Sequence, residues 1–316
     1  YFVLEDNCRT PSGVSYMLEN REIMMRMFPD LFLKNRVTPI DNYPTRLLQT
    51  LMSLAPQKCE SSEPVVVLLT PGPLNSAYYE HSFLSDQMGI EMVESNDLIV
   101  EGKYLYMKTV DGLKRVDVVY RRIDDDFLDP LCFNSQSVIG VPGIMDVYKT
   151  GGVNICSAPG AGIADDKAIY IYVPEMIKFY LGEKPILENV ETWNCEKSDQ
   201  LQYVLENISN LVVKEVDGSG GYGMLIGPKS SKTEIDIFKN KLSTNPNGYI
   251  AQPLLDLSFT PTLIKNHVEG RRVDLRPFCL IGKEAQLSSG GLTRVAMNEG
   301  SFVVNSSQGG GVKDTW

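Results

Sequence analysis

The sequence contains few of the residues that build zinc centres or disulfide frameworks. Its 316 residues include two histidines, His81 and His267, and six widely separated cysteines that form no C-x-x-C pair. Zinc sites in proteins need histidines and cysteines clustered at short spacings, so a zinc-dependent function is disfavoured. Unpaired, scattered thiols are typical of a reducing compartment, and we therefore expect a cytoplasmic protein.

Long hydrophobic runs and an excess of positive charge are also missing. No apolar stretch of the sequence reaches the roughly 18 residues that a membrane span requires. Residues 1–5 are typical of a strand and do not resemble a signal peptide. With 30 basic and 40 acidic residues the net charge is −10, which disfavours binding to nucleic-acid backbones. The sequence therefore predicts partners that are neither membranes nor nucleic acids.

The sequence does contain enough apolar material for a folded core. Hydrophobic residues make up 43% of the chain and charged residues 22%, which is typical of an ordinary globular protein. The length suits roughly two domains. Because the chain starts without a methionine and stops abruptly at Trp316, we expect both ends to be truncated.

Residues 56–150 alternate between predicted strands and predicted helices. An apolar run of strand length at residues 65–69 ends in a turn rich in proline and glycine, and a helix follows at residues 77–88. Further strands are predicted at residues 91–93 and 116–120. This alternation predicts a parallel sheet, and such sheets bind ligands beyond the carboxyl ends of their strands.

A glycine-rich loop is the sharpest local signal in the rest of the chain. A strand at residues 211–216 leads into Gly218-Ser219-Gly220-Gly221-Tyr222-Gly223, and a second strand leaves the loop at residues 224–226. Four glycines in six residues allow backbone N–H groups to approach a polyphosphate. The loop lacks the Gly-Lys-Ser/Thr ending of a Walker loop, and it lies between two strands, unlike a Rossmann turn. With Lys214 on the entering strand, we predict a flap over a nucleoside triphosphate; a glycine hairpin without a ligand is the alternative.

Two further segments could contact the same nucleotide. Lys167 opens a predicted helix after a glycine-rich turn, where its ammonium group could meet phosphate oxygens. A solvated residue at a helix start is the alternative. The apolar strand at residues 249–254 could present adenine with one backbone donor and one acceptor, near Gln252, Pro253 and Leu254. Taken alone, that segment predicts only a strand.

In their order along the chain, these segments resemble a known family. The nucleotide-binding half of the ATP-grasp fold has similar elements at similar spacings: Lys167, Lys214 with its glycine loop, the strand at 250–254, Arg276 and Arg294. ATP-grasp ligases carry a metal-binding Glu-x-Asn near their end, whereas here Glu5 and Asn7 provide it at the front. The sequence therefore resembles the circularly permuted ATP-grasp family, whose members are often labelled glutathionylspermidine synthases. Four phrases carry this resemblance over the whole chain: residues 5–13, 71–78, 120–126 and 305–311.

The resemblance implies a fold class and a domain organisation. The fold would be α/β, a circularly permuted ATP-grasp fold with a Rossmann-like parallel-sheet substrate domain. Residues 1–55 would hold the permuted metal-binding strand and helices of the ATP-grasp core. Residues 56–150 would form the α/β domain on the substrate side. Residues 151–316 would form the nucleotide-binding region, with the flap at residues 211–226.

The resemblance also implies an activity, an ATP- and Mg²⁺-dependent ligase that joins a carboxylate to an amine through an acyl phosphate. Mg²⁺ prefers oxygen ligands, and Glu5 and Asn7 would bind it, with a third ligand expected upstream of residue 1. Arg294, and after it Arg276, would hold the transferred group, because a guanidinium fork can grip phosphate oxygens. The residues that would contact ATP are Lys167, Lys214, Gly218, Ser219, Gly220, Gly221, Tyr222, Gly223, Gln252, Pro253 and Leu254.

Polar residues that follow predicted strands or turns are the candidates for binding the carboxylate and the amine acceptor. They are Arg9, Ser12, Asn75, Ser76, Arg121 and Arg122. Arg121 or Arg122 could hold a substrate carboxylate, or either could neutralise the aspartates that follow at residues 124–126. The sequence is also compatible with assembly into a homo-oligomer.

Three alternatives to a ligase remain open at this point. Residues 125–129 match the D-D-x-x-D pattern with which prenyl-diphosphate enzymes hold Mg²⁺, but those enzymes are helical and this chain alternates strands and helices. A degenerate ATP-grasp protein could bind nucleotide as a scaffold, although the retention of Glu5, Lys167, Lys214 and Arg294 argues against decay. A kinase-like phosphotransferase would differ from a ligase by forming no amide product.

Overall fold

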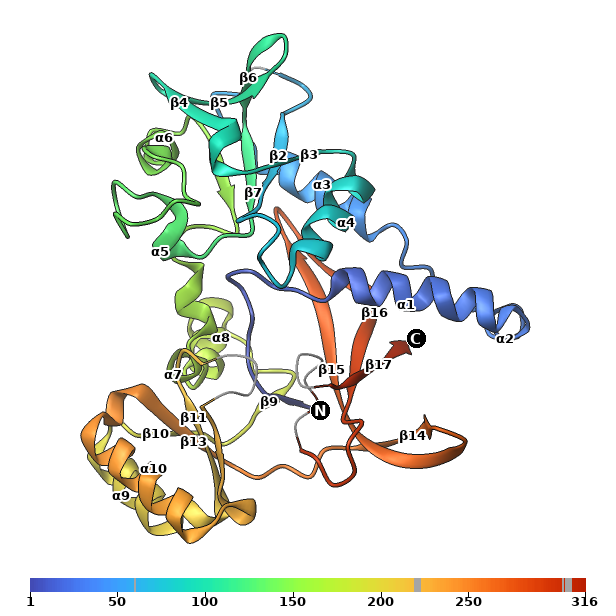
Figure 1. Cartoon of the computed structure of the whole chain (residues 1–316), viewed down its shortest axis with the longest axis vertical. Helices are drawn as coiled ribbons and strands as arrows, with labels where there is room; N and C mark the ends of the chain where they lie inside the picture. Colours follow the sequence, from blue (N-terminus) through green and yellow to red (C-terminus); the bar gives the residue numbers. More distant parts are fainter. Residues whose placement is uncertain (60, 219–222, 303, 305–308) are drawn as a thin grey trace. The chain divides into compact units, whose positions relative to one another are not determined.

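The computed structural model describes residues 1–59, 61–218, 223–302, 304 and 309–316 (Figure 1). The chain divides into two compact units, each built from separated stretches of sequence. Unit 1 comprises Tyr1–Cys8, Gly162–Asp274 and Val295–Gly311, and unit 2 comprises Arg9–Ala161, Leu275–Arg294 and Val312–Trp316. The three-part division at residues 55 and 150 stays a prediction. The first eight residues belong to the unit that also contains Lys167 and Lys214.

The central sheet of unit 2 is parallel, as the alternation of strands and helices predicts. Its strands are β2 (Val66–Leu69), β3 (Glu91–Val93), β7 (Val118–Arg121) and β8 (Asn154–Cys156), in the order β3-β2-β7-β8. All three neighbouring pairs are parallel. Every residue of β2 and β7 is buried, because a parallel sheet covered on both faces needs continuous apolar strands.

Helices and loops cover this sheet. The helices of unit 2 are α1 (Val14–Met27), α2 (Pro29–Lys34), α3 (Tyr43–Ser53), α4 (Tyr78–Met88), α5 (Asp125–Leu128) and α6 (Ile144–Lys149), and η1 (Ser95–Asp97) is a short 3-10 turn. Successive strand residues point to opposite faces. Leu68 therefore packs in a core with α1, α3 and α4, whereas Val67 and Leu69 pack in a second core with α6. A separate antiparallel sheet contains β4 (Leu98–Glu101), β5 (Tyr104–Thr109) and β6 (Gly112–Val116).

Unit 1 contains an antiparallel sheet in which two strands flank the glycine-rich sequence. Its strands are β10 (Trp193–Asn194), β11 (Leu211–Glu215), β12 (Leu225–Ile226) and β13 (Tyr249–Pro253), in the order β10-β13-β11-β12. The helices α9 (Ser198–Asn207) and α10 (Lys232–Thr244) pack against it through a core that includes Val204, Val213 and Leu242. Short 3-10 turns lie at η3 (Ile208–Asn210), η4 (Gly227–Lys229) and η5 (Pro246–Gly248).

The front of the chain joins unit 1 through a very short strand. Strand β1 (Phe2–Val3) pairs in parallel with β9 (Glu188–Asn189), near the turn η2 (Ala161–Asp165) and the helices α7 (Lys167–Tyr170) and α8 (Val173–Leu181). The expectation that Glu5 and Asn7 lie on a strand is wrong, because β1 ends at Val3. Beyond that point side chains hold the backbone: the amide of Cys8 donates to Asp165 Oδ1 at 2.5 Å.

A third four-stranded sheet contains β14 (Phe259–Ile264), β15 (His267–Ile281), β16 (Ala285–Val295) and β17 (Gly311–Thr315) in sequence order. The long strand β15 begins in unit 1 and continues into unit 2 at Leu275. The last seventy residues are therefore rich in strands. Among the helices of the described residues, none combines the length and the apolar character that crossing a bilayer would need.

Removing a large side chain from the doubly covered sheet should destabilise the protein strongly. Leu68 is fully buried, so Leu68→Ala should lower the free energy of unfolding by about 2–5 kcal/mol through lost burial and a residual cavity. Leu74, which is fully exposed in the loop after β2, provides the matched control. Chemical denaturation should show Leu74→Ala within about 0.5 kcal/mol of wild type. Equal effects of the two substitutions would contradict the described core.

Candidate functional site

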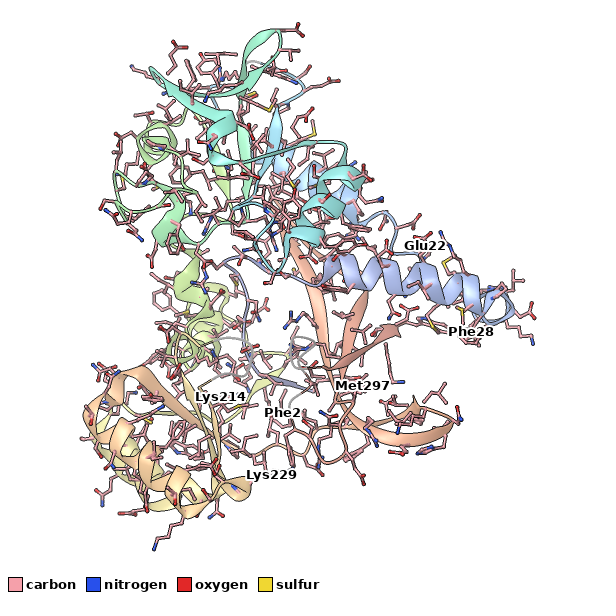
Figure 2. The ribbon with its side chains drawn as sticks, in the orientation of Figure 1. Phe2, Glu22, Phe28, Lys214, Lys229 and Met297 are labelled. Atoms are coloured by element: carbon pink, nitrogen blue, oxygen red, sulfur yellow. The ribbon has the colours of Figure 1, made fainter. Side chains whose placement is uncertain are left out.

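Lys214 lies on β11 in the middle of the antiparallel sheet of unit 1, and Figure 2 labels its side chain. Its ammonium group donates to Gln252 Oε1 at 2.7 Å, and the amide nitrogen of Gln252 donates to Thr192 Oγ1 at 2.9 Å. Burial lowers the pKa of Lys214; the carboxylate of Glu5 opposes this shift and the ammonium group of Lys167 adds to it. The structure therefore brings both Glu5 and Lys167 within electrostatic range of Lys214.

Lys167 contacts the start of the glycine-rich loop. It is the first residue of α7, where the side chain of Asp166 caps the helix by accepting from the amide of Ala168 at 2.7 Å. The Lys167 amide donates to the carbonyl of Val216 at 3.1 Å, and its ammonium group donates to the carbonyl of Gly218. The lysine is thus held against the first residues that follow β11. Ser219, Gly220, Gly221 and Tyr222, which are predicted to contact ATP, lie outside the described residues.

The last glycine of the loop is required by its surroundings. Gly223 has a φ of 69°, in the left-handed region that favours glycine. A Cβ atom at this position would also lie 2.6 Å from the carboxylate of Glu215. The backbone conformation therefore selects glycine where the chain returns to β12, and a side chain there would also displace the Glu215 carboxylate.

Glu5 and Asn7 are exposed, whereas Asp6 between them is half-buried. Burial raises the pKa of Asp6, and the carboxylates of Asp165 and Glu5 raise it further. The hydroxyl of Tyr170 anchors the preceding residues, because it donates to the carbonyl of Val3 and accepts from the amide of Val190 at 2.7 Å. Glu5 and Asn7 thus differ from Asp6 in exposure, and their role as metal ligands stays a prediction.

The donor set suits a hard cation that completes its shell elsewhere. Within the described ranges, no group of three or more His, Cys, Asp or Glu side chains is arranged to hold a metal ion. Glu5 and Asn7 offer one carboxylate and one amide oxygen. Mg²⁺ commonly takes one or two protein oxygens together with phosphate oxygens and water. The residues present fit that mode, and two lysines beside them fit a polyphosphate.

The two candidate arginines for the transferred group belong to unit 2. Arg276 lies on β15, half-buried, and its Nη1 donates to the carbonyl of Ser12 at 3.1 Å. Arg294 lies near the end of β16 and is also half-buried. The glycines before Arg294 let the strands approach, because a Cβ atom at Gly291 would meet the carbonyl oxygen of Arg276 at 3.1 Å. The roles of both arginines stay predictions.

Four of the candidate substrate-binding residues lie on turns or loops of unit 2. Asn75 and Ser76 are exposed in the loop after β2, where Asn75 Oδ1 accepts from the amide of Ala77 at 2.8 Å. Arg9 forms an ion pair with Asp124 at 3.4 Å. Ser12 Oγ donates to the carbonyl of Thr10 at 3.3 Å. Their contacts with substrate stay predictions.

Arg121 and Arg122, at the carboxyl end of β7, are almost completely buried, with 0% and 4% of their surface exposed. Arg121 donates to the carbonyls of Ile123, Ser157 and Ala158 at 2.6, 2.8 and 3.1 Å. It also forms an ion pair with Asp125 at 2.8 Å, which supports the alternative that it neutralises the following aspartates. Binding of a substrate carboxylate by either arginine stays a prediction.

Arg122 has a buried partner that the sequence reasoning missed. Its Nη2 atom lies 3.3 Å from Glu80 Oε1, and both side chains are nearly inaccessible. Glu80 lies on the same face of α4 as Leu84 and Met88, four and eight residues later. An acidic residue on the apolar face of a predicted amphipathic helix was the signal that could have identified it.

His81, next to Glu80, is buried and joined to the loop after β2. Its Nδ1 atom lies 2.9 Å from Thr70 Oγ1, which also accepts from the amide of Gly72 at 3.2 Å. Burial, together with the neighbouring guanidinium of Arg122, lowers the pKa of His81 to about 3. The imidazole is therefore neutral in the folded protein at physiological pH.

Comparisons with known proteins identify relatives over nearly the whole chain. A sequence model of the family described as circularly permuted ATP-grasp type 2 matches residues 1–296. An uncharacterized protein of Synechocystis is 57% identical over 317 residues, which cover 100% of this chain and 66% of the relative. An uncharacterized protein of Mycobacterium tuberculosis is 52% identical, covering 99% of this chain and 57% of the relative.

Two further similarities concern proteins with more informative descriptions. A Frankia alni protein with a provisional glutamate–cysteine ligase name is 40% identical, covering 100% of this chain and 36% of the relative. The chain thus spans less than two thirds of these curated relatives. The apo structure of a glutathione synthetase-like effector from Globodera pallida aligns with a TM-score of 0.62 at 13% identity, covering 98% of this chain and 70% of that chain. That likeness shows the fold alone, and it agrees with the predicted ATP-grasp architecture.

The neutral, buried His81 predicts a pH dependence of stability. Its folded-state pKa is depressed, so the unfolded chain takes up a proton below about pH 6.5 while the folded chain does not. Stability should therefore be lost as the pH falls from about 6.5 toward 3. The advantage of wild type over His81→Asn in free energy of unfolding should shrink by about 1.5 kcal/mol between pH 6.5 and pH 5. Between pH 7.5 and 8.5 it should stay constant; a difference that is constant down to pH 5 would contradict the burial of a neutral imidazole.

Proposed function

This chain belongs to the circularly permuted ATP-grasp type 2 family, and we propose on that premise that it is an ATP- and Mg²⁺-dependent ligase that joins a carboxylate to an amine. The observation that carries the proposal is the arrangement of charges in unit 1. Lys167 holds the start of a glycine-rich loop, and Lys214 lies on the strand that enters this loop. Glu5 is close enough to Lys214 to influence its pKa. Cationic groups beside a glycine loop suit a triphosphate, and a nearby carboxylate suits its cation.

Each of these residues would have a distinct task. Lys214 is kept in place by Gln252, so its ammonium group would meet phosphate oxygens without first having to be ordered. Lys167 would bind phosphate while it holds the start of the loop. Glu5 and Asn7, both exposed, would hold Mg²⁺ through oxygen atoms, whereas Asp6 is half-buried. Arg294 and Arg276 would grip the transferred group through their guanidinium forks.

When bound, Mg²⁺-ATP would supply the phosphoryl group that activates the carboxylate as an acyl phosphate, from which an attacking amine displaces phosphate. The residues of unit 2 at the carboxyl edge of the parallel sheet would bind and orient the carboxylate and the amine. Arg9 and Ser12 lie on the turn before α1, and Asn75 and Ser76 follow β2, so all four are placed where such sheets bind ligands. We also propose that the protein is located in the cytoplasm.

The substrates are proposed only as a chemical class. A provisional glutamate–cysteine ligase name in a relative supports a small amino-acid carboxylate and an amino-acid amine. A reaction like that of glutathionylspermidine synthase, with a peptide carboxylate and a polyamine, is the second option within the same chemistry. The two share one activation step and differ in the carboxylate and in the amine acceptor.

The direct test is product analysis. The protein is incubated with ATP, Mg²⁺ and a panel of amino acids, small peptides and polyamines, and mass spectrometry looks for amide products formed in step with ADP. We expect one carboxylate–amine pair to give an amide with one ADP per bond formed. Phosphorylated product without an amide would instead indicate a phosphotransferase. ATP binding without turnover would indicate a scaffold.

Glu5 and Asp6 form a matched pair for testing the metal site. Glu5→Ala should slow ATP-dependent turnover by about 10²-fold or more, because charge stabilisation in the phosphoryl-transfer step is lost. Asp6→Ala removes the same charge one residue away and should change turnover only a few-fold. Steady-state ADP release over a range of Mg²⁺ concentrations measures both variants. Normal turnover in Glu5→Ala would exclude the proposed metal role.

A further inference from the structure

Two pairs of adjacent buried residues meet the loops at the carboxyl edge of the parallel sheet of unit 2. One pair is Glu80 and His81 on α4, and the other is Arg121 and Arg122 at the end of β7. All four are at most 4% exposed. Burial of a charged group is costly unless it is paired and hydrogen-bonded. The hydrogen-bond partners of these side chains therefore indicate which part of the structure the buried groups hold in place.

Glu80 provides the N-terminal cap of α1 from a different helix. Its Oε2 atom accepts from the amide of Gly13 at 2.7 Å, the amide of Ser15 at 3.1 Å and the hydroxyl of Ser15 at 2.9 Å. The first amides of a helix have no partner within the helix, and a negative charge there is favourable. One buried carboxylate thus satisfies three donors of the turn that leads into α1.

The residue at the cap position cannot provide this acceptor itself. Gly13 has a φ of 115°, and a Cβ atom there would lie 3.3 Å from Leu292 and 3.5 Å from Phe278. Ser, Thr, Asp or Asn, the usual capping residues, would be both strained and crowded at this site. The cap therefore has to come from elsewhere in unit 2, and Glu80 supplies it.

Arg122 holds the other side of the same turn. Its Nη1 atom donates to the carbonyl of Pro11 at 2.8 Å, and its Nη2 atom donates to Ser12 Oγ at 2.7 Å and to Glu80 Oε1 at 3.3 Å. Arg276 adds a bond to the carbonyl of Ser12 at 3.1 Å. Each residue from Pro11 to Ser15 except Val14 thus has a polar contact with one of these three side chains, and Val14 packs in the core.

We propose that Glu80 and Arg122 are a positioning pair that sets the turn from Pro11 to Ser15 in the geometry that binds the carboxylate substrate. The inference rests on the proposed function, because Arg9 and Ser12 on or beside this turn are the groups assigned to substrate. Neither Glu80 nor Arg122 touches substrate in this scheme. Arg122 acts through Ser12, whose hydroxyl it orients, and Glu80 acts through the backbone and through Arg122.

A purely stabilising role does not account for the arrangement. Buried ion pairs are commonly replaced by apolar residues without loss of stability. Here the pair directs five hydrogen bonds at one short segment, three accepted by Glu80 and two donated by Arg122 to Pro11 and Ser12, and a sixth joins the two side chains. Such a concentration of hydrogen bonds on one segment is expected where a turn must keep a single conformation.

Glu80→Gln tests the proposal, because it keeps the size of the side chain and removes its charge. Amide hydrogen exchange, measured without any ligand, should become about tenfold faster at Gly13 and Ser15 while the rest of unit 2 stays protected. The kinetic measurement uses L-glutamate, ATP and hydroxylamine, an amine that traps activated carboxylates as hydroxamates. The KM for L-glutamate should rise about tenfold or more, whereas the KM for ATP should change less than about twofold.

Asp314→Asn is the matched control. Asp314 forms a buried ion pair with Arg21 at 2.6 Å in the same unit, with side chains 2% and 6% exposed. The substitution should lower stability to a similar degree but leave both the exchange at Gly13 and Ser15 and the KM for L-glutamate unchanged. Should Glu80→Gln fail to fold, Ser15→Ala removes one of the three donors to Glu80 and should give a smaller shift of the same kind.

The two proposals fail in distinguishable ways. If wild type forms no hydroxamate or amide with any carboxylate tried, the proposed ligase activity fails, while hydrogen exchange still decides whether Glu80 holds the turn. If exchange at Gly13 and Ser15 is unchanged in both Glu80→Gln and Ser15→Ala, the positioning role is overturned. The same conclusion follows if the KM for L-glutamate rises no more in Glu80→Gln than in Asp314→Asn.

Discussion

Burial of both faces of the parallel sheet in unit 2 is the constraint on which the rest of that unit depends. Apolar strands such as β2 and β7 leave water-filled space only beyond their ends. A charged group beside such a sheet is removed from water and must find a protein partner. Arg121, Arg122 and Glu80 find theirs in the loops that follow the strands and in the turn before α1. Charge at this edge therefore orders the backbone of the surrounding loops.

Unit 1 meets a different requirement, because it must bring the front of the chain beside residues more than 160 positions later. The strand pairing available for this is only two residues long, between β1 and β9. Side-chain hydrogen bonds provide most of the attachment: the hydroxyl of Tyr170 donates to the carbonyl of Val3, and the carboxylate of Asp165 accepts from the amide of Cys8. Glu5 then lies within electrostatic range of Lys214. Because the chain is circularly permuted, these noncovalent contacts hold the N-terminal segment where an unpermuted chain would have a covalent connection.

Local patterns in the sequence predicted the elements better than the contacts. The apolar run before Thr70 predicted a buried parallel strand, and the glycines after Lys214 predicted a strand–loop–strand, because both depend on neighbouring residues alone. The extent of β1 was wrong, since strand pairing depends on a partner at residues 188–189 that local sequence does not reveal. Glu80 was missed for a similar reason: a carboxylate on the apolar face of a helix is unusual, but its partners lie 65 and 42 residues away.

The sequence by itself determined the fold class, the family and the chemical types available for phosphate, metal and carboxylate binding, because these follow from residue identity, order and spacing. Tertiary structure decided which charged groups are accessible and which are buried and paired with other groups of the protein. Arg121 and Arg122 are adjacent to aspartates in sequence, yet Arg121 binds loop carbonyls together with Asp125, and Arg122 binds Glu80 and the turn before α1. The physical reason is that the energy of a charge depends on its burial and on its nearest partners, and both come from segments distant along the chain.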